Sequence, residues 1–142
     1  ATRKKNNIYV HGRIDDVINI RGHRIGSGEI ESTVLKLPEV YECSAISKDD
    51  NLEGKVLNLF LVSKKNNMNS KIENIILDNF GSFAIPRSIY YLNELPKTRS
   101  GKILRRLLRK IVENPKLQNY GDTTTILNPN VIDKIKKEIN VR

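Results

Sequence analysis

Residues 96–102 (PKTRSGK) have the composition of a loop that presents one lysine to an anion. Pro96 and Gly101 interrupt regular structure, and the small residues before the lysine let a backbone approach a ligand closely. The following residues predict a helix over 103–113, which would place Lys102 at its first turn, where free N–H groups favour negative charge. The stretch therefore predicts phosphate or carboxylate chemistry at Lys102.

Two common nucleotide-binding motifs do not fit this chain. A P-loop needs Gly six positions before its lysine and Ser or Thr after it, and these positions hold Pro96 and Ile103. A dinucleotide fingerprint fails as well, because Glu31 follows Gly26-Ser27-Gly28 where a third Gly is required. The lysine belongs to neither motif.

A second stretch, residues 12–24 (GRIDDVINIRGHR), lies far upstream of the lysine. Together the two stretches resemble the carboxy-terminal signatures of adenylate-forming enzymes, the acyl-CoA synthetase superfamily. A third stretch, residues 120–129 (YGDTTTILNP), narrows the resemblance to AMP-forming acetyl-CoA and propionyl-CoA synthetases. The resemblance runs from about Tyr9 to about Ile139, and three motifs in family order make it specific.

The resemblance implies a role for each of several residues in the adenylation half of the reaction. Lys102 would be the adenylation lysine, which bridges the acyl carboxylate and the α-phosphate region of ATP. A flexible ammonium group suits this role because the reaction brings two anions together. Asp15 would be the hinge to a large amino-terminal domain. Arg13 would approach the nucleotide, and Arg24 would contact its phosphates through a planar guanidinium group.

The resemblance also implies a coenzyme A-facing edge. Gly22 would line the tunnel for the pantetheine arm, where a side chain would obstruct the thiol, and Arg21 would bind coenzyme A beside it. One position departs from the family. Related enzymes tend to carry a basic residue near Leu77 for the 3′-phosphate of coenzyme A, and this chain has none, so that contact is either lost or provided elsewhere.

Ligands and partners follow from the same resemblance. They are ATP or AMP, coenzyme A, acetate or propionate, and an N-terminal adenylation domain in the same chain, with Mg²⁺ needed by the full-length enzyme but not bound here. An acetyltransferase and a deacetylase acting on Lys102 are further candidate partners, because acetylation would remove its charge. We expect a cytoplasmic enzyme, with nuclear or organellar pools left open, and no catalysis by the isolated fragment.

Composition leaves one alternative open. The chain has 142 residues and a net charge of +9, which suits either nucleic acid or a polyphosphate ligand. Against a nucleic-acid module, only 6% of residues are aromatic and none interleaves with the Arg-rich helix. A stand-alone interaction domain that kept the family fold is a further alternative.

Other features are expected to be structural. No apolar run approaches the length of a membrane span. The single Cys43 lies in an apolar run and is expected to be buried rather than reactive. His23 and His11 are expected to be structural or surface residues, because no Ser, Cys or metal-ligand partner lies at useful spacing, and no metal site is expected.

The apolar periodicity predicts a small α+β domain, with helices packed on a mixed or mostly antiparallel sheet. Gly26 to Gly28 should form a turn with Ser27 as a helix N-cap, and Ser70 with Glu73 should form a capping box. We divide the chain into a hinge approach (1–14), the mobile domain core (15–113) and a C-terminal extension with a terminal helix (114–142). The expected strands are 8–10, 17–20, 40–47, 55–63 and 87–92, and the expected helices are 28–37, 70–80, 103–113 and 130–139.

Overall fold

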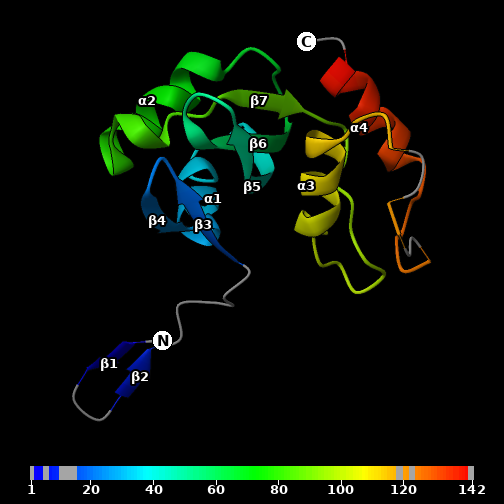
Figure 1. Ribbon diagram of the computed structural model, residues 1–142. Coiled ribbons are helices and arrows are strands. Elements are labelled where there is room, and N and C mark those ends of the chain that lie inside the picture. Colours follow the sequence, from blue (N-terminus) through cyan, green and yellow to red (C-terminus); the bar gives the residue numbers. More distant parts are fainter. Residues whose placement is uncertain (1, 5–6, 10–15, 118–119, 122–123, 141–142) are drawn as a thin grey trace.

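The computed structural model describes residues 2–4, 7–9, 16–117, 120–121 and 124–140, and its architecture is α+β as predicted (Figure 1). Its main sheet has the strand order β5-β6-β7, formed by β5 (Val40–Asp50), β6 (Gly54–Ser63) and β7 (Ser88–Tyr91). Strands β5 and β6 are antiparallel, whereas β6 and β7 are parallel. The parallel pair needs a crossover, which α2 (Asn69–Phe80) provides. The sheet is therefore mixed, with β6 at its centre.

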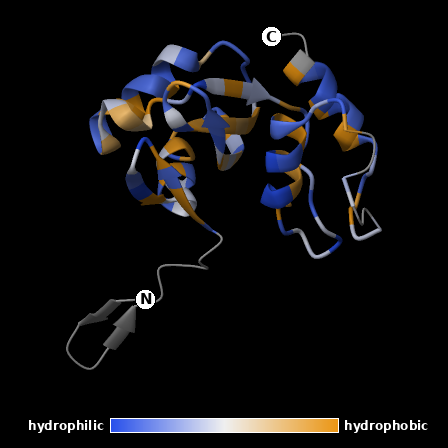
Figure 2. Ribbon diagram, viewed as in Figure 1, coloured by the Kyte–Doolittle hydropathy of each residue, from blue (hydrophilic) through white to orange (hydrophobic). Residues whose placement is uncertain are grey.

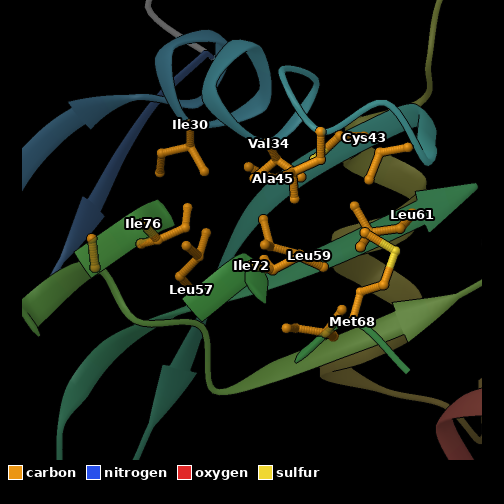
Figure 3. Packing of buried hydrophobic residues seen from close by; sticks show 14 of the residues in the cluster. Ile30, Val34, Cys43, Ala45, Leu57, Leu59, Leu61, Met68, Ile72 and Ile76 are labelled. Carbon is orange, nitrogen blue, oxygen red and sulfur yellow. The ribbon is translucent and has the colours of Figure 1, made fainter. Parts of the chain in front are cut away.

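Strand β6 divides the hydrophobic core into two clusters because its side chains alternate in direction. Leu57, Leu59 and Leu61 join one cluster, while Phe60 joins the other and stacks on Tyr90. Figure 3 shows the first cluster, where residues of α1 (Ser27–Val34) and α2 meet β6. The second cluster is formed with α3 (Arg105–Glu113) and α4 (Val131–Asn140). The two helix pairs therefore cover opposite faces of one sheet.

Two hairpins precede the main sheet. Strands β1 (Thr2–Lys4) and β2 (Asn7–Tyr9) pair with each other, and β3 (Val17–Ile20) pairs with β4 (His23–Gly26). The turn between β3 and β4 consists of Arg21 and Gly22, whose φ angles are 47° and 84°. Positive φ at both positions is the mark of a type I′ turn, which suits the twist of a two-residue hairpin.

The sequence did not predict β4, and the turn expected at 26–28 is wrong. Gly26 ends β4, and α1 begins directly at Ser27. The N-cap is Gly26, without a side-chain hydrogen bond, so the expected N-cap role of Ser27 is also wrong. Strand β4 has one buried apolar residue, Ile25, which is too little for an alternating pattern to be visible.

The capping box at the start of α2 is likewise wrong. The helix begins at Asn69 after Met68, and neither Ser70 nor Glu73 caps it. Tertiary contacts fix this start instead. The Met68 amide donates to the Tyr91 hydroxyl at 3.0 Å, and that hydroxyl lies 2.8 Å from Asn69 Oδ1. A hydroxyl from β7 thus takes the place of a local cap.

Helix α3 is amphipathic, as the sequence predicts. Its buried residues are Leu107, Leu108, Ile111 and Val112. Figure 2 shows apolar residues along one side of α3 and hydrophilic residues along the other. Across the described part of the chain, no helix has the length and apolar character that crossing a membrane would need.

Candidate functional site

Lys102 lies in a short hairpin and not in a helix. Lys97 and Ile103 form an antiparallel bridge, and the Thr98 amide donates to the Lys102 carbonyl oxygen at 2.9 Å. The Leu104 amide donates to the Pro96 carbonyl oxygen at 2.8 Å, so α3 begins only at Arg105. The expectation that Lys102 occupies the first helical turn is therefore wrong, because the Lys102 carbonyl oxygen and the Leu104 amide form hydrogen bonds with residues 96–98.

The tip of this hairpin is tied together by short polar contacts. The Gly101 amide donates to the Thr98 carbonyl oxygen at 2.9 Å, with Gly101 at a φ of 83° that other residues rarely adopt. The Thr98 hydroxyl lies 2.9 Å from the Ser100 hydroxyl and accepts a hydrogen bond of 3.1 Å from the Lys102 amide. The backbone of Lys102 is thereby fixed while its side chain is exposed.

The third sequence motif lies directly against this hairpin. Thr98 and Ile126 form an antiparallel bridge. The Leu127 amide donates to the Lys97 carbonyl oxygen at 2.9 Å, and the Arg99 amide donates to the Thr125 carbonyl oxygen at 3.3 Å. We define the Lys102 unit as residues 96–104 together with 125–127. The sequence showed both stretches but gave no signal that they pair.

Arg105 anchors the other end of the hairpin. Its Nε and Nη2 atoms donate to the two carboxylate oxygens of Glu31 on α1, at 2.9 and 2.6 Å. The same Glu31 carboxylate accepts the Ala45 amide of β5 at 2.9 Å. The Glu31 side chain is 9% exposed, and its hydrogen bonding to Arg105 raises the pKa of Arg105 above its ordinary value. The pair ties α1, β5 and α3 together.

Arg105 also reaches the segment that precedes β3. Its Nη1 atom lies 3.5 Å from Asp16 Oδ1, in an ion pair about one-third exposed. Asp16 follows the predicted hinge residue Asp15. Asp15 and Arg13, the nucleotide-approaching residue expected from the sequence, lie outside the described residues, as does His11. Sequence reasoning missed Arg105 because it is one basic residue within a basic run.

A hollow of about 830 Å³ lies beside the Lys102 unit. Asp16 and Thr98 line part of it. The rest of the polar lining comes from four basic side chains, those of Lys102, Arg105, Arg106 and Arg109. Glu31 and Asp16 both pair with Arg105, so the charge of this arginine is compensated within the protein. An anion in this hollow would face a lysine on a fixed backbone, which is the arrangement that phosphate or carboxylate chemistry requires.

The edge around Gly22 belongs to the β3–β4 hairpin. Arg21 Nε donates to Glu53 at 2.8 Å, and Nη1 donates to the carbonyl oxygens of Ser82 and Phe83 at 3.3 Å. His23 stacks on Phe83 with ring centroids 3.9 Å apart, a packing contact compatible with the expected structural or surface role. Gly22 is exposed, and an added Cβ atom would meet no neighbour within 4 Å.

The structure does not group all predicted site residues in one place. Ile18, Ile20 and Ile25 hold the β3–β4 hairpin in the first core cluster, whereas Ile126 holds the Lys102 unit in the second. Arg24, expected at the nucleotide phosphates, is exposed on β4, and Leu77 on α2 is 42% exposed. Gly22 with Arg21 and Arg24 thus forms one edge, and Lys102 belongs to another.

Comparison with known proteins gives consistent matches. The family model described as AMP-binding enzyme C-terminal domain matches residues 29–102. Acetyl-coenzyme A synthetase of Penicillium chrysogenum is 38% identical over 136 residues, which are 93% of this chain and 20% of that protein. Acetyl-coenzyme A synthetase 2 of Pseudomonas putida is 40% identical over 138 residues, which are 93% of this chain and 21% of that protein.

The solved structures agree. A Brucella canis acyl-CoA synthetase matches with a TM-score of 0.63 and 36% identity, over 70% of this chain and 19% of that one. The chain spans about a fifth of the length of the relatives that it matches. These relatives give no support to the nucleic-acid alternative.

Proposed function

Given that the chain belongs to the family of AMP-binding enzyme C-terminal domains, we propose that it is the mobile domain of an AMP-forming acetyl- or propionyl-CoA synthetase. The observation that carries the proposal is Lys102, exposed on a fixed hairpin beside a basic hollow. In the first half of the reaction, a short carboxylate and ATP give an acyl-adenylate and pyrophosphate. In the second half, coenzyme A displaces AMP and forms the thioester.

Lys102 acts in the first half. The carboxylate oxygen and the α-phosphate are both anionic, so their approach is opposed by charge repulsion. An ammonium group placed between them offsets that repulsion and stabilises the charge that redistributes in the transition state. The fixed backbone of Lys102 supports this role, because the direction from which the side chain extends is set before substrate arrives.

The two edges give the domain two working surfaces, with Asp15 as the proposed hinge between orientations. One orientation brings Lys102 to the reacting centre. The other withdraws it and presents Gly22, whose open surroundings suit the passage of a pantetheine arm. The packing of the two edges on opposite faces of the sheet supports this division, because a rotation can present either one in turn.

The remaining ligand contacts are assigned to arginines and to the missing larger domain. Arg13 and Arg24 would bind the phosphates of ATP or AMP. Arg21 would contact coenzyme A only if it released Glu53, its partner in this structure. The larger domain would hold Mg²⁺. Mg²⁺ would supply charge neutralisation at the phosphates.

The same proposal extends to regulation and location. The exposed Lys102 ammonium is open to an acetyltransferase and a deacetylase, and its acetylation would remove the charge that adenylation needs. An acetylated full-length enzyme that still formed adenylate would contradict this. We place the enzyme in the cytoplasm, and we expect no catalysis by this domain alone, because the acyl and adenine pockets belong to the rest of the enzyme.

The decisive experiment compares half-reactions in the full-length enzyme, wild type against Lys102→Ala. Adenylate formation should be lost, while thioester formation from supplied acyl-adenylate should be retained. Lys116→Ala, at an exposed lysine beyond α3, is the matched control and should leave both rates unchanged. Retained adenylate formation in Lys102→Ala would contradict the proposal, and loss of both half-reactions would indicate a general folding defect.

A further inference from the structure

We propose that residues 125–127 act as a positioning element for Lys102, so that the C-terminal extension takes part in adenylation. This inference rests on the function proposed above. The starting observation is that the family match covers only residues 29–102, whereas the segment that pairs with the Lys102 hairpin begins at residue 125. The hairpin is therefore supported by chain that lies outside the matched family domain.

The contact is made by backbone on both sides. Lys97 to Arg99 form the outer edge of the hairpin, and this edge would present its N–H and C=O groups to water if nothing covered it. Residues 125–127 cover it through the Thr98–Ile126 bridge and the hydrogen bonds Leu127 to Lys97 and Arg99 to Thr125. Lys97 to Arg99 thus become the middle of three segments, with residues 101–103 on one side and residues 125–127 on the other.

The covering segment is itself anchored independently of the hairpin. Ile126 is 5% exposed and lies in the second core cluster with α3 and α4. On its C-terminal side, the Asn128 amide group donates to Glu94 at 2.7 Å, and Lys134 of α4 reaches the same carboxylate at 3.2 Å. On its N-terminal side, the buried Tyr120 donates to the Asn114 carbonyl oxygen at 3.0 Å. A segment held at both ends can restrain the loop beside it.

This restraint matters because the Lys102 ammonium group lies far from the backbone hydrogen bonds that hold the residue. Its ammonium group ends a long side chain, so a small tilt of the hairpin moves it away from the reacting atoms. Arg105 fixes the helix side of the hairpin through Glu31, and residues 125–127 fix the opposite edge. Loss of one supporting backbone hydrogen bond should reduce the population of the productive loop by about twofold to tenfold.

The sharpest test removes a single N–H group. Leu127 is 65% exposed, so its side chain contributes little packing. Leu127→Pro deletes the amide that donates to Lys97, whereas the control Leu127→Ala keeps it. In the full-length enzyme, Leu127→Pro should slow adenylate formation by about twofold to tenfold relative to Leu127→Ala, while thioester formation from supplied acyl-adenylate stays equal.

A second pair of variants guards against misfolding of the proline variant. Ile126→Ala weakens the anchor beside the hairpin, whereas Ile135→Ala opens a comparable cavity in the same cluster within α4. Ile126→Ala should impair adenylation selectively, and Ile135→Ala should not. Amide hydrogen exchange at Arg99 in the full-length enzyme should quicken in Leu127→Pro but not in Leu127→Ala.

Equal adenylation rates and equal exchange in the two Leu127 variants would overturn the inference. If Lys102→Ala abolishes adenylation in the same assay, the proposed function survives that result. If Lys102→Ala leaves adenylation intact, the proposed function fails and this inference fails with it. Faster thermal unfolding in Leu127→Pro with an unchanged ratio of half-reaction rates would reduce the segment to a stability element and would also overturn the proposal.

Discussion

The contact between Glu31 and Arg105 should contribute strongly to the stability of the domain, and Glu31→Ala is the change that tests it. The carboxylate accepts three hydrogen bonds, two from Arg105 and one from the Ala45 amide, and is 9% exposed. Removing it leaves a guanidinium group without its main partner and orphans a buried N–H group. Either consequence destabilises the folded state but not the unfolded one.

The magnitude follows from the burial of the partners. Truncating one member of a fully buried ion pair costs about 3–5 kcal/mol, and the Arg105 side chain keeps 30% exposure, so water recovers part of this and about 2–3 kcal/mol remains. The orphaned Ala45 amide adds about 1 kcal/mol. A total of about 3–4 kcal/mol should lower the melting temperature of a chain this size by about 10–15 °C.

The assay is thermal and urea unfolding of the purified chain, followed by circular dichroism. Glu39→Ala is the matched control, because Glu39 pairs with Lys71 through side chains that are 23% and 49% exposed. That pair should contribute far less to stability, because water screens an ion pair at the surface. If Glu31→Ala destabilises the chain no more than Glu39→Ala does, then the carboxylate does not hold α1, β5 and α3 together and the reasoning is refuted.

Two further predictions concern single positions. Gly22→Ala should cost about 1 kcal/mol of folding stability, because φ at this position is 84°. In the full-length enzyme the same change should slow thioester formation by about tenfold and leave the rate of adenylation within about twofold. An equal effect on both half-reactions, measured by single-turnover kinetics, would count against a coenzyme A-facing role. Burial, aided by the neighbouring Glu31 carboxylate, raises the pKa of the Cys43 thiol far above its ordinary value, so a thiol reagent at pH 8 should label Cys43 only after urea unfolding. Rapid labelling of the folded chain would show that this part of the core opens.

The sequence predicted those parts of the fold that depend on local pattern. The apolar run of β6 indicated a central strand, and the 3.6-residue periodicity of α3 indicated its buried side. Both are confirmed, because each records which side chains avoid water. The Lys102 motif was likewise visible, since Pro, Gly and Ser mark a loop directly.

The errors arise where tertiary contacts decide the local structure. The start of α2 depends on the hydroxyl of Tyr91, which is 22 residues from its partner Asn69. The start of α3 depends on a hairpin whose other side is Pro96 to Thr98, because the Thr98 amide binds the Lys102 carbonyl oxygen that a longer helix would have used. Neither contact can be read from the residues around the helix end. Rules based on local propensity therefore predicted both helix starts incorrectly.

The candidate site shows the same division. Lys102 and Gly22 are recognisable by residue type, whereas Glu31, the partner of Arg105, lies 74 positions away in the chain. Glu31 sits on α1 among residues that read as an ordinary amphipathic helix. Only the fold brings these two charges together, so no spacing rule could have found the anchor of the Lys102 hairpin.

The alternation along β6 has a consequence for how this domain tolerates change. Leu59 and Phe60 are neighbours in the chain, yet they serve separate clusters, one beneath the β3–β4 hairpin and one beneath the Lys102 unit. Substitution at either residue should disturb mainly the surface on its own side. An insertion of one residue within β6 would instead turn every later side chain to the wrong face. Under the proposed function, a single change in length would then disturb both working surfaces, whereas a substitution would disturb one.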